Sequence, residues 1–481
     1  MTAAAIMLES DAVPSTYTVT KPTPTATATA PVEPTTAAHA AEDESASGTA
    51  VDAVDPNALN PYIHLVRDQH ITIIPSFTLE CGETLTSVPV AYKTWGTLNA
   101  AKDNAIVVCH ALSGSADVAD WWGPLLGARR VFDPRRWFIV CCNVLGSPYG
   151  SASPVTINPA TGELYGAHFP RVSVRDDVRL HRLVLDQLGV ESVAFAIGGS
   201  MGGMQVLEWG AQFGPEYVRH LVPMATAARH SAWCIAWGEA QRQAIFADPA
   251  YNAGEYDQEN PPRAGLAAAR IQAMLTYRTR DSFQARFARR FTKGADRTQG
   301  DLSVMGVPHN DGLGHFAHAT TGNKVTPGVF SAQSYLRYQG DKFVHRFDAN
   351  CYVAITRKLD THDLARPYDE DVDPDEAYTA ALQRLTQPTL VLAVASDGLF
   401  TVAEHEELVA ALPNGELGVI ASPDGHDGFL LEFDQVGHAV DEFMRRVAPE
   451  YFADDLDGAS ESEVAAPTES STFGEVDLTA W

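Results

Sequence analysis

The chain has 481 residues, of which 45% are hydrophobic, and its formal net charge is −27. This length allows either one large α/β unit with an insertion or two to three domains. The negative charge argues against nucleic acid or an anionic membrane surface as a partner, because chains that bind phosphates carry an excess of Lys and Arg. The ends supply much of the charge: residues 1–57 contain eight acids and one base, and residues 450–481 contain nine acids and no base.

Both ends are predicted to be disordered. Residues 14–50 are rich in Pro, Thr and Ala, and they contain too few large apolar side chains to offset the entropy of ordering. We therefore expect a disordered acidic tail over residues 1–57. The segment 450–481, rich in Asp, Glu and Ser, is expected to be a second one.

The cysteines and the apolar runs indicate the compartment. The six cysteines form no CxxC pair, and Cys109, Cys141 and Cys142 lie in apolar runs, which predicts buried free thiols and a reducing environment. No apolar stretch reaches the roughly 18 residues that a membrane span requires, and the N-terminal residues have no pattern of a secretory signal or a mitochondrial transit peptide. We expect a cytoplasmic protein.

The apolar runs predict a mostly parallel sheet. Residues 70–97 alternate between apolar and polar side chains, which predicts an antiparallel hairpin at the sheet edge. Later runs are continuously apolar, as in strands covered on both faces. They span residues 104–114, 135–146, 191–200, 218–227, 387–397 and 415–422. Helical patterns between them, such as residues 173–190 with a Ser-x-x-Asp start and a final Gly, predict crossover helices on both faces of the sheet.

The alternation of strands and helices stops between residues 229 and 386. This segment is rich in Ala, Arg and Gln and has helical patterns, so we expect a mainly helical lid over the carboxyl ends of the strands. The predicted organisation is a tail (1–57), a first part of the core (58–228), the lid insertion (229–386), a second part of the core (387–449) and a second tail (450–481).

Ser200 is the candidate nucleophile. It lies in Gly-Gly-Ser-Met-Gly, a G-x-S-x-G pattern between a predicted strand and a predicted helix. This context is required for a nucleophile elbow, in which small residues permit a strained turn that exposes the serine. Taken alone, the pattern also suits an ordinary turn.

Asp397 and His426 complete a candidate catalytic triad. Each lies after a predicted strand, and the order Ser200, Asp397, His426 is that of the α/β-hydrolase fold. A serine hydroxyl requires a base within hydrogen-bond reach, and the base requires a group that fixes its tautomer. The conjunction of the three residues predicts the α/β-hydrolase fold, with a helical lid insertion, and nucleophilic catalysis.

Two backbone N–H groups are candidates for an oxyanion hole. One belongs to Met201, which follows the nucleophile, and the second is expected from Leu112, in the loop after the strand at residues 104–114. The alternative for the second position is an ordinary strand-to-helix loop.

Three histidines raise the question of a metal. His309, His315 and His318 lie in the Gly-rich stretch 297–328, without a helical i, i+4 pair and without a cysteine partner. We therefore expect no metal site.

Long spaced motifs carry a resemblance to a known family. "VAYKTWGTLN", "HALSGSADVADWW", "FIVCCNVLGSPYGSASP", "GGSMGGMQVLEW" and "SYLRYQGDKFVHRFDANCYVAITRKLDTHD" together resemble the homoserine O-acetyltransferase family. The similarity extends over roughly residues 60–447. It implies acetyl transfer from acetyl-CoA to L-homoserine in methionine biosynthesis, through an acetyl-serine intermediate, with no permanently bound cofactor.

The resemblance also implies substrate-binding residues and a partner. Arg270 is expected to bind the substrate carboxylate, Tyr277 to line the same pocket, and Asp427 to bind the substrate ammonium. The lid helices are expected to form a homodimer contact. The alternatives are a sibling acyltransferase (homoserine O-succinyltransferase, serine O-acyltransferase or a cephalosporin-type acetyltransferase), a carboxylesterase or a non-catalytic binding protein.

Overall fold

The computed structural model of the chain describes residues 55–291, 330–366 and 371–453. The predicted disorder over residues 1–54 and 454–481, and the histidines of the stretch 297–328, lie outside the described residues. The predicted tails include residues 55–57 and 450–453, which the structure describes, so both tail boundaries are corrected. The buried side chain of Asn57 donates to the carbonyl of Gly150 at 3.0 Å, and the ring of Tyr451 lies 5.0 Å from that of Trp137. Average composition does not reveal such single anchoring contacts.

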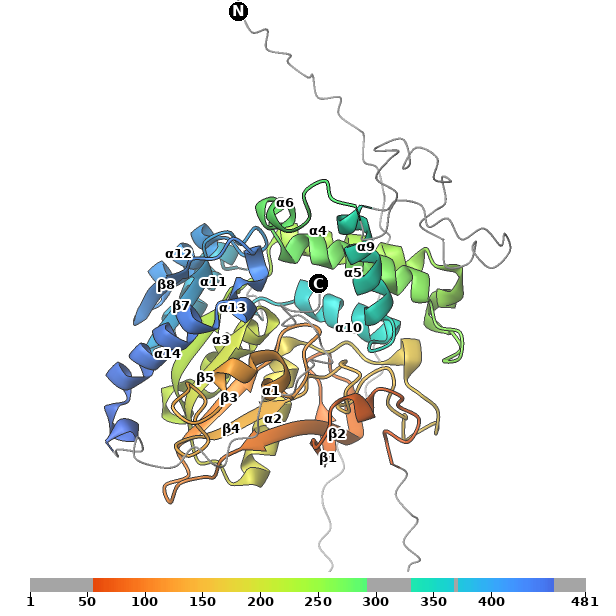
Figure 1. The fold of residues 1–481 in the computed structure, drawn as a ribbon. Coiled ribbons are helices and arrows are strands. Elements are labelled where there is room, and N and C mark those ends of the chain that lie inside the picture. Colours follow the sequence, from red (N-terminus) through yellow and green to blue (C-terminus); the bar gives the residue numbers. More distant parts are fainter. Residues whose placement is uncertain (1–54, 292–329, 367–370, 454–481) are drawn as a thin grey trace, which may run out of the picture. The chain divides into compact units, whose positions relative to one another are not determined.

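One eight-stranded sheet organises the described residues (Figure 1), and its strands follow the order β1-β2-β4-β3-β5-β6-β7-β8. The predicted edge hairpin is confirmed, because β1 and β2 pair in antiparallel orientation and β1 lies at the edge. β2 also pairs antiparallel with β4, and the other pairs are parallel. The strands are β1 (His70–Thr78), β2 (Thr84–Trp95), β3 (Ala105–Cys109), β4 (Phe138–Cys142), β5 (Val193–Gly199), β6 (Val218–Met224), β7 (Thr389–Val394) and β8 (Gly415–Ile420).

Strand burial matches the continuous apolar runs, with one exception. β3, β4, β5 and β7 are buried at every residue, as expected for strands with helices on both faces. The run at residues 415–422 does form a strand, but the prediction that it is covered on both faces is wrong. β8 is the last strand of the sheet, and Val419 in it is 52% exposed. Hydrophobicity along one segment carries no information about its position at a sheet edge.

Helices cover both faces of the sheet. One face packs against α2 (Val174–Leu188), α3 (Met201–Tyr217), α11 (Pro374–Gln383) and α12 (Val402–Ala411), and the other against α1 (Val118–Trp122), α13 (Gly428–Leu431) and α14 (Phe433–Val447). The predicted start and end of α2 are confirmed. Ser173 and Asp176 form a capping box, and Gly189 ends the helix at a φ of 80°.

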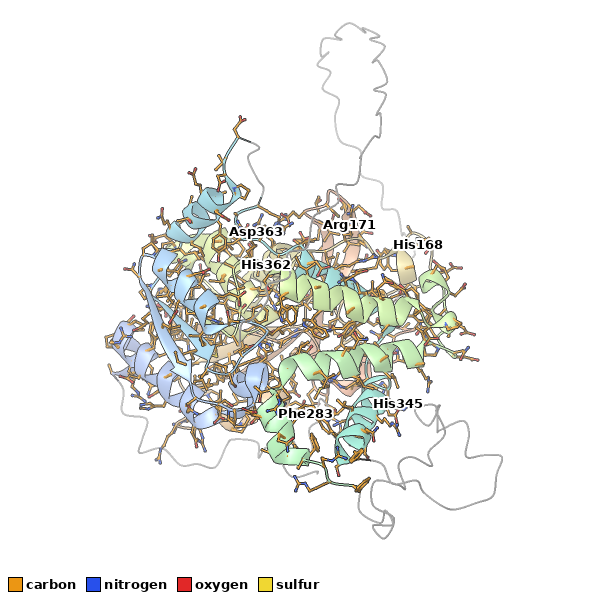
Figure 2. The ribbon with its side chains drawn as sticks, turned by 90° about the horizontal axis from the view of Figure 1, so that it is seen from above. His168, Arg171, Phe283, His345, His362 and Asp363 are labelled. Atoms are coloured by element: carbon orange, nitrogen blue, oxygen red, sulfur yellow. The ribbon has the colours of Figure 1, made fainter. Side chains whose placement is uncertain are left out.

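The segment between β6 and β7 is mainly helical, as predicted. Figure 2 shows α4 and α5 side by side, with Phe283 on α6 and His345 just after α9. The lid helices are α4 (Ala232–Phe246), α5 (Arg263–Tyr277), α6 (Arg280–Phe287), α9 (Ser331–Phe343) and α10 (Ala349–Asp360). One apolar cluster joins α4, α5, α9 and α10 to Met201 at the start of α3. The predicted lid boundary at residue 386 lies too late, because Leu382 and Leu385 at the α11 end pack into the core beneath the sheet.

A buried ion pair anchors the lid to the core. Lys358 of α10 lies 2.6 Å from Asp177 of α2, and both side chains are fully buried. Lys358 also donates to the carbonyl of Leu145, whose own N–H donates to Asp177. The pair fixes α10 against the sheet, beside the carboxyl ends of the strands.

The other sequence-based expectations concern thiols and membrane spans. All six cysteines are free, and five of them, Cys81 being the exception, are buried. Among the described residues, no helix has the length and the apolar composition needed to cross a membrane.

Candidate active site

Ser200 lies in a strained turn between β5 and α3. Its φ of 58° and ψ of −125° place a side-chain-bearing residue in a sparsely populated region, at a cost of about 1–3 kcal/mol. The turn is fixed because the Ser200 N–H donates to the carbonyl of Met224 at 2.9 Å. Only glycine fits at Gly202, since a side chain there would collide with the Cys109 carbonyl. The predicted nucleophile elbow is therefore the local structure.

The three predicted triad residues meet at the carboxyl edge of the sheet. His426 Nε2 lies 2.9 Å from Ser200 Oγ, and His426 Nδ1 lies 2.8 Å from Asp397 Oδ2. The other carboxylate oxygen of Asp397 accepts the N–H groups of Leu399 and Phe400 at 2.8 and 3.0 Å. With Asp397 accepting from Nδ1–H, Nε2 is left to accept the serine proton, as a general base requires.

Two residues that sequence reasoning missed support the nucleophile. The Thr226 hydroxyl donates to the carbonyl of Ser200 at 2.7 Å, and the Thr226 N–H donates to His405 Nε2 at 3.0 Å. His405 is fully buried, and its Nδ1 lies 2.7 Å from the carbonyl of Thr401. Burial lowers the pKa of His405, so the ring stays neutral and holds both bonds. His405 follows no strand and belongs to no motif, so no sequence signal distinguishes it.

The loop after β3 lies beside the elbow because β3 pairs with β5. His110 holds the start of this loop: its Nδ1 lies 2.8 Å from the Ala111 carbonyl, and its Nε2 accepts the Val144 N–H at 3.2 Å. Burial lowers the pKa of His110 to about 4, which keeps the ring neutral and its two bonds in place. Leu112, two residues on, lines a cavity together with Ser200, and its part in an oxyanion hole stays a prediction.

This cavity, of about 580 Å³, opens beside the triad. It has apolar walls from Trp121, Phe429 and Leu430, and it presents charged groups of both signs, from Arg346 and Asp427. Clefts with mainly apolar walls and a few convergent polar groups are typical of small-molecule sites. We call it the first cavity.

Of the two predicted substrate residues on α5, Arg270 is not among the described residues that line the first cavity. Tyr277 lines the first cavity, and its ring lies 5.9 Å from that of His426. Arg270 is 2% exposed, so it is not a surface arginine. Its guanidinium lies 5.7 Å from the ring centre of Tyr277 and 5.0 Å from that of Phe343, and such cation–π contacts partly compensate for burial of the charge.

Asp427 follows the catalytic histidine directly and faces the same cavity. It is 3% exposed and forms an ion pair with Arg278, whose Nε lies 2.7 Å from Asp427 Oδ2. Arg278 also contacts Asp424 at 3.0 Å. Burial opposes the charge of Arg278, but the two neighbouring carboxylates raise its pKa overall. The sequence did not predict that Asp427 is held by an arginine.

Arg346 is the arginine that lines the first cavity itself, and it was not among the predicted site residues. Its guanidinium donates to the Ser113 carbonyl at 3.1 Å and to the Tyr149 hydroxyl at 3.2 Å, and it lies 4.9 Å from the ring centre of Phe343. Arg346 and Arg270 thus approach the same phenylalanine ring. Arg346 lies in the last of the motifs that carry the family resemblance, but no spacing in that motif distinguishes it from the neighbouring arginines.

Comparison with known proteins identifies the family. The alpha/beta hydrolase fold family model matches residues 104–433, more than half of the chain. The homoserine O-acetyltransferase of Emericella nidulans is 50% identical over 480 residues, covering 89% of this chain and 98% of that protein. The enzyme of the same name from Saccharomyces cerevisiae is 47% identical, covering 90% and 98%. The chain belongs to the homoserine O-acetyltransferase family. The resemblance predicted from the motifs is thereby confirmed.

Solved structures share the fold of this family member. The homoserine O-acetyltransferase of Bacillus anthracis has a TM-score of 0.67 at 21% identity, covering 79% of this chain and 97% of that one. The esterase E22 has a TM-score of 0.66 at 22% identity, covering 78% and 99%. The predicted α/β-hydrolase fold is confirmed. Since an esterase and a transferase share it almost equally, the fold alone does not choose between hydrolysis and transfer.

Proposed function

We propose that the chain is an acetyl-CoA:L-homoserine O-acetyltransferase that acts in methionine biosynthesis. The observation that carries the proposal is the hydrogen-bonded series Ser200, His426 and Asp397 at a cavity that also presents a guanidinium and a carboxylate. The identity of 45–50% to curated enzymes of this name over most of the chain supports it. Acetyl-CoA is a co-substrate, and the chemistry requires no permanently bound cofactor.

The reaction proceeds through an acetyl-serine. Ser200 Oγ attacks the thioester carbonyl carbon while its proton passes to His426 Nε2, and the C–S bond then breaks as the proton passes to the CoA thiolate. The homoserine hydroxyl attacks the resulting ester, His426 takes its proton, and Ser200 Oγ leaves with that proton. The N–H groups of Met201 and Leu112 would stabilise the oxyanion in both steps.

Acceptor recognition depends on charge in the first cavity. An amino acid zwitterion requires a cation for its carboxylate and an anion for its ammonium. Arg346 and the nearby Arg270 supply positive charge, and Asp427 supplies negative charge beside His426. We propose that Arg270 and Arg346 together bind the carboxylate, that Asp427 binds the ammonium and that Tyr277 lines the acceptor site. An esterase has no need for this pair of charges.

The test of this function is CoA release by the purified full-length chain. We expect rapid release from acetyl-CoA with L-homoserine, slower release with L-serine and little with water alone. Equal release with and without an amino acid would identify a hydrolase instead. Faster release from succinyl-CoA than from acetyl-CoA would identify the succinyl-transferring sibling.

Arg270→Ala should weaken use of the acceptor without preventing acetylation of Ser200. Loss of a charge-assisted hydrogen bond lowers kcat/KM for homoserine by roughly 10- to 100-fold. The measurement compares steady-state kinetics with the amount of acetyl-enzyme formed from acetyl-CoA alone, seen by intact mass. Arg280→Ala, at an exposed position on the lid, is the matched control. Loss of acetyl-enzyme formation in Arg270→Ala would refute the role in acceptor binding.

The location and assembly of the protein follow from other features. The free cysteines fit a reducing compartment, and we propose that the enzyme is cytoplasmic.

We also propose a homodimer formed by the lid, because α4, α5 and α9 expose Trp233 (57%), Leu275 (48%) and Tyr338 (53%). Sedimentation equilibrium at micromolar concentration should give the mass of two chains, and the mass of a single chain would exclude this dimer.

A further inference from the structure

A second cavity, of about 510 Å³, meets the first at Ser200. Ser200, Leu112 and Tyr277 line both cavities, whereas the second extends towards α4, α10 and the loop after β7. Among the described residues, His426 and Asp427 line the first cavity and are not among those that line the second. The nucleophile therefore has His426 on one side and a separate space on the other.

The direction of proton transfer indicates which part of the substrate occupies each of the two cavities. His426 Nε2 must protonate the departing thiolate and later deprotonate the attacking hydroxyl, so both groups pass through one position beside His426. That position belongs to the first cavity. In the proposed mechanism, the carbonyl oxygen points to the N–H groups of Met201 and Leu112. The remaining substituent of the reacting carbon, the acyl chain, then points away from His426, where the second cavity begins.

The second cavity extends beyond the space next to Ser200, since residues of α3, α4, α5, α10 and the loop after β7 line it. Much of its wall is apolar, from Met204, Cys234, Trp237 and Phe400. Neutral acyl chains of three or four carbons fit such a wall without exposing a polar group to it.

One corner of the second cavity presents a carboxylate. Asp360 lines it and lies 2.6 Å from the Arg242 guanidinium, which also lies 2.9 Å from Glu239. The positive charge of Arg357 also acts on both carboxylates, so two arginines balance the two acids. Neither arginine is among the described residues that line the cavity, so a negatively charged acyl chain would meet the Asp360 carboxylate first and be repelled by it.

We propose that the second cavity binds the acyl chain of the acyl-serine, that it accepts neutral chains longer than acetyl, and that Asp360 disfavours dicarboxylic acyl groups such as succinyl. The inference rests on the proposed acyl transfer through Ser200. It assigns the choice of donor to a lid residue that lines the second cavity and is not among the described lining residues of the first.

The first experiment measures acyl-enzyme formation from acyl-CoA alone, by intact mass and by CoA release. For the wild-type chain we expect propionyl- and butyryl-CoA to react within roughly tenfold of acetyl-CoA, and succinyl-CoA to react much more slowly. Asp360→Asn, a neutral isostere, should raise the ratio of succinyl to acetyl rates by roughly tenfold. Asp375→Asn makes the same change at an exposed position and should leave the ratio as it is. An unchanged ratio in Asp360→Asn overturns the role of Asp360.

A second variant tests the location independently of charge. Thr276 lines the second cavity and is half-buried on α5, so Thr276→Phe adds bulk to the cavity. It should lower the butyryl-to-acetyl ratio of acylation rates by at least roughly tenfold. Ala264→Phe, at an exposed position of the same helix, is the control. A butyryl-to-acetyl ratio that is unaffected by Thr276→Phe would place the acyl chain elsewhere.

These measurements separate the inference from the proposed function. Acyl-enzyme formation needs no acceptor, so the donor ratios report on the second cavity even if homoserine fails to speed CoA release. A lack of homoserine stimulation overturns the proposed function alone. If neither Asp360→Asn nor Thr276→Phe changes the ratios of acylation rates between donors, only the assignment of the second cavity to the acyl chain is overturned.

Discussion

Ser200→Ala should abolish the acetyl-enzyme and lower the rate of homoserine acetylation by roughly 10⁴-fold or more. The variant lacks the hydroxyl oxygen that lies 2.9 Å from His426 Nε2, so no covalent intermediate forms at this position. Residual activity would come from direct transfer between bound substrates, stabilised by the oxyanion donors. Intact mass after incubation with acetyl-CoA provides the measurement.

The control for Ser200→Ala must exclude misfolding and other nucleophiles. Alanine meets the same backbone strain at a φ of 58° as serine does, so the melting temperature should change little. Ser113→Ala alters another serine that lines the first cavity and should retain the acetyl-enzyme. A labelled adduct that persists in Ser200→Ala would assign the nucleophile to a different residue.

The triad was predictable because it depends on strand ends. Ser200, Asp397 and His426 each follow an apolar run, and parallel strands bring their carboxyl ends to one edge of the sheet. Local chemistry then sufficed: a G-x-S-x-G pattern, an acid and a histidine in a known order. The capping box of α2 was predictable for the same reason, since its partners lie three residues apart.

The remaining parts of the site depend on contacts between distant segments. Arg346 reaches the first cavity through bonds to Ser113 and Tyr149, about 200 residues earlier in the chain. His405 supports Ser200 through Thr226, from α12, the helix that follows β7 in the chain. Neither set of contacts leaves a pattern in the sequence around Arg346 or His405. The second cavity likewise exists only because α4, α10 and the loop after β7 pack around Ser200.

Asp397→Asn should lower the rate of homoserine acetylation by roughly 10⁴-fold while leaving the fold intact. Asp397 accepts the His426 Nδ1–H through Oδ2 and two backbone N–H groups through Oδ1. An asparagine has only one acceptor oxygen. If that oxygen keeps the backbone bonds, its NH₂ group faces His426 and favours the tautomer with the proton on Nε2, which cannot accept the serine proton.

The pattern of loss is as informative as its size. His426 transfers the proton in both half-reactions, so Asp397→Asn should slow enzyme acetylation and deacetylation by homoserine to similar extents, whereas Arg270→Ala affects only the second. Rapid-quench measurement of each half-reaction provides the comparison, with Asp434→Asn at an exposed position as the control and melting temperature as the check on folding. A variant that retains more than about a tenth of wild-type acetylation would show that Asp397 does not set the tautomer of His426. A loss confined to deacetylation by homoserine would instead make Asp397 part of acceptor binding. A defect in His426, the base that both half-reactions use, would slow acetylation as well.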